Sequence, residues 1–321
     1  MPDIDGAGWS TLGIDGWKDV GRVREVLVRG ADPDLWGDVS PLHEAALWGS
    51  PQVVAELACR VGDVDGMREG RTALWNAVFG DRLDNARALV AAGADLWRPV
   101  MAGWSPGRLS LAGRRSGVFT PPPGERGLDA GELAAVAEAQ RLTAALGDFF
   151  HEGMGLACAA GIDSAGAARR LDAAPHRDGE LDTFEDALGF YDGDQDMEVM
   201  GLTDVPGGCV VTQPWGYAPT TTLVMELLSA GTVCYGMYAN AKSGNQGDIA
   251  RDGVIVGHDL HPGGGDPDPA DSPGGVLAAY LYQDQPIAFC CACAGLRPTD
   301  ARAFTGPPDI WVNLPERDCW H

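Results

Sequence analysis

The chain has 321 residues, of which 45% are apolar and 21% charged, a composition typical of a folded protein with about two domains. Its 46 acidic residues outnumber 23 basic ones, and the formal net charge is −23. Because nucleic acids and anionic lipids are bound by clustered Lys and Arg, this charge predicts that the protein binds neither. No apolar run approaches the ~18 residues of a membrane-spanning helix, and no secretory signal is evident. We expect a cytoplasmic protein without a membrane span.

Two similar segments lie near the amino terminus. Residues 40–46 read Ser-Pro-Leu-His-Glu-Ala-Ala, and residues 72–78 read Thr-Ala-Leu-Trp-Asn-Ala-Val. Each begins with a side chain that caps helices, and Pro41 suits a first helical turn because its missing N–H donor is not needed there. Apolar residues at helical spacing follow in residues 51–57 and 83–90. The pattern predicts pairs of short helices that recur along the chain.

This recurrence resembles the ankyrin family, whose units repeat at about 33 residues. The resemblance covers residues 14–115, as two full units with a partial unit at either end. It implies an all-α array whose stacked helices hold a protein partner and perform no chemistry of their own. It also implies that Trp36 and Trp97 lie in loops between units, at the usual contact surface. With Trp48, they are our candidates for binding a protein partner, since aromatic side chains carry much of the energy of interfaces.

Bulky aromatic side chains in a short array have a second interpretation, which is that they seal the ends of the array. For Trp36 and Trp97, both interpretations stand. For Trp75 and Trp104 we favour burial, because aromatic side chains more often pack into a core than bind a partner.

The region after the array changes in character. Residues 116–128 are rich in Pro and Gly and predict a linker. Asp129 and Glu132 have the spacing of a capping box, which predicts an alanine-rich helix to about residue 149. We interpret residues 129–321 as an α+β domain, an antiparallel sheet with helices on one face. Its other expected helices are 163–171, 221–230 and 273–282, and its expected strands are 198–203, 208–213, 232–239, 248–252, 254–259 and 286–292.

This half of the chain resembles a domain of unknown function found in actinobacterial proteins. The resemblance rests on residues 161–163, on Ala167 with residues 169–171, on residues 228–232, and on Asp252-Gly253 within a predicted hairpin. Such domains recur joined to ankyrin repeats. Since that family has no established activity, the resemblance implies an architecture and no chemistry.

One acidic segment imitates the start of a calcium loop. Asp192, Asp194 and Asp196 alternate as in an EF-hand, but Met197 and Thr203 occupy the places where that loop needs Gly and Glu. We interpret the segment as a solvated acidic turn.

Two other groups combine reactive side chains. In a strand, only Asp259 and His261 of the 258–261 segment would share a face, and no third metal ligand is evident, so polar side chains that fasten the loop 263–265 are the favoured interpretation. In residues 289–293, at the end of the expected strand 286–292, Cys291 and Cys293 would share one face. We expect them to pack as small apolar groups, because no base or helix terminus is placed to activate them. The sequence predicts neither a metal nor another cofactor.

Two loops are the best candidates for binding a small ligand. Trp215 and Tyr217 follow one expected strand, and Lys242 and Asn245 follow another. Loops on a rigid sheet commonly carry binding groups, although residues 243–245 also suit an ordinary turn.

Two functional hypotheses follow. The favoured one is a protein–protein interaction protein, in which the array binds a partner and the α+β domain adds a second surface or binds a small ligand. The alternative is a cofactor-free enzyme, a cyclase or hydrolase of specialised metabolism. Its candidate catalytic residues are Tyr238, Asn240, Asp259 and His261.

Overall fold

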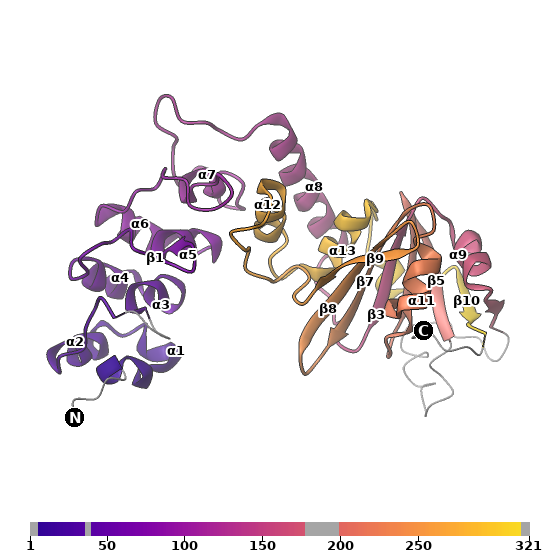
Figure 1. Cartoon of the computed structure of the whole chain (residues 1–321), viewed down its shortest axis with the longest axis horizontal. Coiled ribbons are helices and arrows are strands. Elements are labelled where there is room, and N and C mark those ends of the chain that lie inside the picture. The colour runs from indigo at the N-terminus through magenta and orange to yellow at the C-terminus, as the bar shows by residue number, and fades with distance from the viewer. Residues whose placement is uncertain (1–5, 36–39, 177–198, 316–321) are drawn as a thin grey trace. The chain divides into compact units, whose positions relative to one another are not determined.

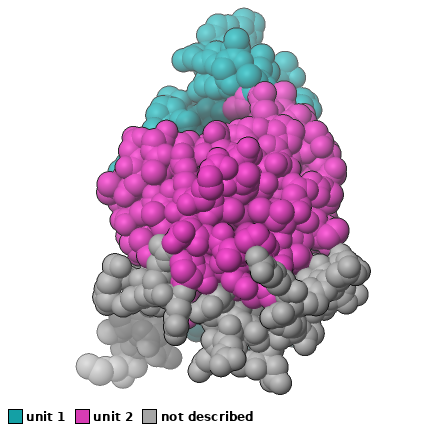
Figure 2. Space-filling model, turned by 90° about the vertical axis from the view of Figure 1, so that its right-hand side faces the viewer, with its two compact units in different colours: residues 1–134, 267–281 teal, residues 135–266, 282–321 magenta. Residues whose placement is uncertain are grey.

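The computed structural model describes residues 6–35, 40–176 and 199–315. The chain forms two compact units, which Figure 2 distinguishes by colour. Unit 1 comprises Met1–Ala134 and Pro267–Leu281, and unit 2 comprises Ala135–Asp266 and Tyr282–His321. The domains expected from the sequence, with boundaries near residues 115 and 129, did not place any late segment in the amino-terminal unit. In the structure, Pro267–Leu281 packs with that unit.

Unit 1 consists mainly of short helices (Figure 1). These helices are η1 (Gly6–Thr11), α1 (Gly13–Gly16), α2 (Val20–Val28), α3 (Pro41–Trp48), α4 (Pro51–Ala58), α5 (Ala73–Phe79), α6 (Leu83–Ala91), α7 (Pro106–Ser110) and α12 (Pro273–Leu281). A longer helix, α8 (Ala130–Leu146), begins in unit 1 and continues into unit 2. Helix α3 packs against α4 and α5, α4 packs against α6, and α5 packs against α6 and α7. Trp75 and Trp104 are fully buried, as expected.

Capping side chains account for where several of these helices begin. The Thr72 hydroxyl accepts a hydrogen bond from the amide of Trp75 at 3.0 Å, which satisfies one of the free N–H groups of α5. At the start of α8, Asp129 and Glu132 each accept a hydrogen bond from the other's backbone amide, which confirms the predicted capping box. Ser40 differs from the expectation, because no helix amide donates to its side chain and its hydroxyl contacts the ring of His43 instead.

Unit 1 also contains a small β-hairpin, so the prediction of an all-α region is wrong in this detail. Strands β1 (Met67–Arg68) and β2 (Arg71–Thr72) pair antiparallel just before α5. Two positive-φ residues, Glu69 and Gly70, make the turn between them.

Helix α12 is fixed within unit 1 although it lies between elements of unit 2 in the sequence. The indole N–H of Trp104 donates to the carbonyl of Pro273 at 2.9 Å. The rings of Phe79 and Tyr280 lie 5.8 Å apart, and Leu277 is 4% exposed. The first two contacts attach α12 to α5 and to the segment just before α7.

Unit 2 is built on an eight-stranded sheet with the order β4-β10-β5-β6-β3-β7-β8-β9, in which every neighbouring pair is antiparallel. The α+β class and the antiparallel sheet are therefore as predicted. The strands are β3 (Gly155–Ala160), β4 (Ala174–Pro175), β5 (Val199–Val205), β6 (Gly208–Gln213), β7 (Val233–Asn240), β8 (Gly244–Arg251), β9 (Val254–Asp259) and β10 (Ile310–Asn313). The remaining helices are α9 (Ser164–Leu171), η3 (Ala218–Thr220), α11 (Thr222–Leu228), α13 (Pro286–Ala294) and α14 (Arg302–Thr305).

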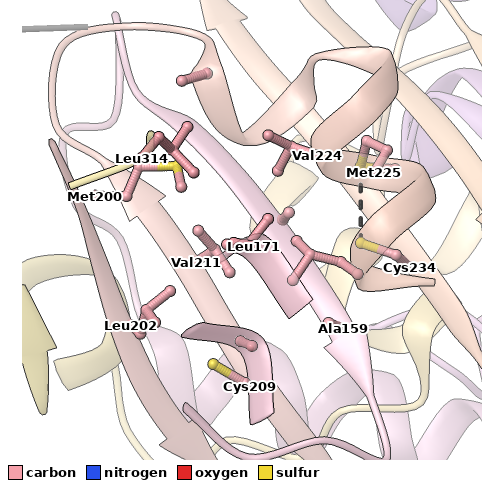
Figure 3. Close-up of a cluster of buried hydrophobic side chains, with 14 of the residues drawn as sticks. Ala159, Leu171, Met200, Leu202, Cys209, Val211, Val224, Met225, Cys234 and Leu314 are labelled. Carbon is pink, nitrogen blue, oxygen red and sulfur yellow. Dashed lines mark hydrogen bonds between the residues drawn. The ribbon is translucent and has the colours of Figure 1, made fainter. Parts of the chain in front are cut away.

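Helices cover both faces of this sheet, and not one face as predicted. Figure 3 shows the core between the sheet and α9 and α11, where the Cys234 sulfur lies 3.7 Å from that of Met225. The next residue, Tyr235, meets Phe289 of α13 at 5.7 Å between ring centroids. Because consecutive residues of a strand point to opposite faces, α11 and α13 lie on opposite sides of β7.

The segment 286–292, which we expected to be a strand, forms most of helix α13. Pro286 occupies its first turn, where a proline costs no hydrogen bond. Gly295 ends the helix with a φ of 76°, a left-handed conformation that favours glycine. Among the described residues, no helix has the length and apolar character needed to cross a membrane.

Candidate functional site

Three segments of unit 2 meet at one end of the sheet. They are the connection 147–154 before β3, the loop 214–217 after β6, and the turn between β7 and β8. Gly153 joins all three, because its amide donates to the carbonyl of Ala239 at 2.7 Å and its carbonyl accepts from the amide of Gly216 at 3.0 Å. The two loops predicted to bind a small ligand are thus brought together.

The convergence of these three segments depends on a glycine at position 153. Its φ is 84°, and a side chain built at this position would collide with the indole ring of Trp215. Only glycine therefore lets the backbone approach the ring so closely. The indole lies against the Gly153 backbone and remains 54% exposed.

Tyr217 of the loop after β6 and Tyr238 near the end of β7 meet each other. Their ring centroids are 5.9 Å apart in an edge-to-face arrangement, which is a favourable geometry for aromatic pairs. Both side chains are half-buried, so they fasten the loops together and expose part of each ring.

An open hollow of about 370 Å³ lies beside this junction. Its walls come from the connection before β3 and from the β7–β8 turn. The side chains that reach it include Phe150, His151, Glu152, Asn240 and Asn245. Its volume lies in the range of small-molecule sites, about 300–1,000 Å³.

A hydrogen bond to the backbone orients the ring of His151 at the edge of the hollow. Its Nδ1 lies 3.0 Å from the carbonyl oxygen of Phe149. A carbonyl can only accept, so we assign the proton of the neutral ring to Nδ1, which leaves Nε2 as an acceptor. Phe149 supports the imidazole edge-on at 5.9 Å and stacks in turn on the buried Phe304 at 6.0 Å.

Asn240 stabilises the β7–β8 turn through its side chain. Its Oδ1 accepts hydrogen bonds from the amides of Lys242 at 2.9 Å and Ser243 at 3.3 Å. Because Oδ1 is engaged in the turn, the Nδ2 group is the part of this amide that can bind a ligand, as a donor. Lys242 is exposed on the turn, whereas Asn245 contributes to the wall of the hollow.

Asp259 and His261, the candidate acid–base pair, have structural roles. One carboxylate oxygen of Asp259 accepts the hydroxyl of the buried Tyr235 at 2.8 Å, and the other accepts the amide of His261 at 2.9 Å. Burial, with the nearby Cys290 and Asp259, raises the pKa of Tyr235 well above its usual range, so the phenol remains a donor. The carbonyl of His261 accepts from the amides of residues 264 and 265, while its side chain is exposed. These contacts fasten the glycine-rich loop.

The four residues proposed to be catalytic do not form one cluster. Asp259 pairs in register with Gly247, whereas Asn240 pairs with Gly244. The two pairs are three positions apart on β8, which corresponds to roughly 10 Å along the strand. Tyr238 packs edge-to-face on Tyr217.

The cysteines of α13 are packing residues. Cys290 and Cys293 have Cys-x-x-Cys spacing, which can mark a redox or metal site. Burial raises the pKa of the Cys293 thiol to about 12 and raises that of Cys290 further, so neither forms the reactive thiolate near neutral pH. Within residues 6–35, 40–176 and 199–315, no group of three His, Cys, Asp or Glu side chains is arranged to hold a metal ion.

The tryptophans predicted to bind a protein partner differ in exposure. Trp48, at the end of α3, is 42% exposed. Trp97 is half-buried, with its ring against the backbone of Gly107 in α7. Trp36 lies outside the described residues, as does the acidic segment 192–196.

Sequence reasoning missed the contribution of Phe149, Phe150, His151 and Glu152. We expected the helix before them to reach residue 149, but α8 ends at Leu146. The signal in the sequence was two aromatic residues, a histidine and a carboxylate in succession before a strand. Comparison with models of known protein families finds no match to the chain, and no curated protein matches it.

Proposed function

We propose that unit 1 is an ankyrin-type array that binds a protein partner. The observation that supports this most is that unit 1 already holds a chain segment distant in sequence, Pro267–Leu281. The Arg71 guanidinium donates to the carbonyl of Pro267 at 3.1 Å, and Trp104 donates to that of Pro273 at 2.9 Å. Arg and aromatic side chains are also enriched where proteins bind one another.

A recurring contact between loops supports the array interpretation. The carboxylate of Asp34 accepts the amide of Gly62 at 2.9 Å, and the carboxylate of Asp65 accepts the amide of Asp95 at 3.1 Å. The acceptor of this bond therefore recurs after 31 residues and its donor after 33, close to the ankyrin period of about 33. Such nearest-neighbour contacts are how stacked units stabilise one another.

We assign the partner-binding surface to the exposed ring of Trp48, with the exposed part of Trp97. An exposed indole provides a large contact area at low conformational cost. A cytoplasmic location belongs to the same proposal, since the described cysteines are free thiols, as expected of a reducing compartment. We do not extend the proposal to a cyclase or hydrolase, because the Asp259 carboxylate is engaged by Tyr235 and the four candidate residues do not form one cluster.

The test is a comparison of two exposed aromatic residues in the intact chain. A partner captured by the wild-type protein is purified, and its affinity for Trp48→Ala and Phe150→Ala variants is measured by calorimetry. Phe150 is the matched control, because it is exposed and lies in unit 2. We expect Trp48→Ala to weaken binding about tenfold or more, the effect of losing an interface anchor.

The control is expected to bind like the wild type. Equal affinity of the Trp48→Ala variant, or an equal loss in the Phe150→Ala variant, would overturn the assignment of binding to unit 1.

A further inference from the structure

We propose that the hollow beside the β7–β8 turn is a carbohydrate-binding site. This inference concerns unit 2 and does not depend on partner binding by unit 1. It rests on two exposed aromatic rings, a mixed set of hydrogen-bond donors and acceptors, and a rigid wall, all at one end of the sheet.

The aromatic rings are the first observation. Among the large apolar side chains exposed in the described part of unit 2, the aromatic ones are Phe150 at 74% and Trp215 at 54%. Phe150 lines the hollow, and Trp215 covers Gly153, the residue after Glu152 of the hollow's wall. Two exposed rings at this end of the sheet offer a ligand flat apolar surfaces on which to pack. The flat C–H faces of sugar rings are apolar surfaces that stack on such rings.

The polar side chains define what else the ligand carries. Asn240 offers its Nδ2 donors, Asn245 a complete amide, Glu152 acceptor oxygens, and His151 the acceptor Nε2. A ligand that satisfies this mixture needs groups that both donate and accept, which is the property of a hydroxyl. Of the residues that the structure describes, no Lys or Arg lines this hollow, and Glu152 would repel an anion. A neutral polyhydroxylated ligand fits best.

The wall is organised before any ligand arrives. Asn240 is fixed by two turn amides, His151 by the carbonyl of Phe149, and Gly153 by two backbone hydrogen bonds. Groups that are already positioned lose little conformational entropy on binding. Because the hollow is open, we infer that it takes the end or one side of an oligosaccharide.

The experiment titrates maltotriose, cellotriose and chitotriose separately into the intact protein and measures heat release by calorimetry. We expect at least one trisaccharide to bind. Phe150→Ala and Asn245→Ala should each weaken that binding by roughly tenfold, the equivalent of one lost stacking or bidentate contact. Trp48→Ala, which removes an exposed ring from unit 1, should leave it unchanged.

Inorganic phosphate and free arginine are titrated as charged probes. No heat from any trisaccharide, unaltered binding in both hollow variants, an equal loss in Trp48→Ala, or tighter binding of either charged probe would each overturn the proposal. Loss of sugar binding in Phe150→Ala would leave partner binding intact, so the two proposals fail separately.

Discussion

The buried side chain of His43 makes the stability of unit 1 depend on pH. Its ring is 6% exposed and lies between the Ser40 hydroxyl, 2.9 Å from Nδ1, and the carbonyl of Arg71, 3.1 Å from Nε2. The carbonyl requires a proton on Nε2, so Nδ1 of the neutral ring accepts from Ser40. Burial lowers the pKa of His43 below the ordinary 6.5, despite the opposing effect of the hydrogen bond to Arg71.

The lowered pKa predicts a loss of stability in mild acid. The unfolded chain takes up the proton at the ordinary pKa of 6.5, whereas the folded chain takes it up only at lower pH. The contribution of His43 to the free energy of unfolding is therefore complete above the pKa of the unfolded chain. It is lost as the pH falls from there toward the pKa of the folded chain. Urea unfolding at about pH 7.5 and 5.5 measures this difference. A His43→Gln variant should show a smaller difference, and one with the wild-type pH dependence would contradict the assignment.

At the scale of elements, the strand predictions were correct where the strand-forming side chains and the turn residues beside them indicated the same bounds. Strands β6 and β9 have the expected bounds, and Asp252 and Gly253 form the turn between β8 and β9. Strand β3 was missed because Gly155–Ala160 consists mainly of small residues with low strand propensity. It is a strand because β6 and β7 pair with both of its edges.

Helix α13 illustrates the opposite error. A short apolar run suits either a buried strand or a buried helix, and the signals that separate them were Pro286 and Gly295 at its ends. The candidate site was likewise predictable only in part. The two loops were found through their turn residues, whereas the place of His151 beside Asn240 depends on pairing that no local pattern contains.

The helical geometry of α13 makes a prediction that a strand would not. Cys291 is fully buried with its sulfur 4.0 Å from that of Cys158, whereas Cys293 is partly exposed. Cys291→Ser should lower the free energy of unfolding by about 1–3 kcal/mol, because it buries a hydroxyl among sulfur and carbon atoms. Cys293→Ser should cost clearly less. Chemical unfolding of both variants measures this, and equal costs would favour two residues on one strand face.

At the scale of the molecule, the core of unit 1 is completed by residues from the second half of the chain. Leu277 of α12 is buried in unit 1, although the elements on either side of α12 belong to unit 2. The sequence predicted the helix but not its location, because the flanking residues suggested one continuous C-terminal domain.

A Leu277→Ala variant should therefore destabilise unit 1 and spare unit 2. The expected loss is about 2–5 kcal/mol, the usual cost of truncating a buried leucine. Hydrogen exchange should show faster exchange of amides in α5 and α7, with those of β3 and β6 unchanged. Leu260→Ala is the matched control, because Leu260 is 67% exposed and should have little effect on either unit. Faster exchange in β3 and β6 alone would show that α12 supports the other unit.

The insertion of α12 into unit 1 also constrains the order of events during synthesis. A ribosome that has released residues 1–134 has produced most of unit 1 but none of the helix that covers Phe79 and Trp104. Those rings must wait while 132 further residues, Ala135–Asp266, are translated. At elongation rates of roughly 5–20 residues per second, that interval lasts about 7–26 seconds. The region translated first is thus among the last to reach its final packing, and a nascent-chain chaperone has that period in which to act.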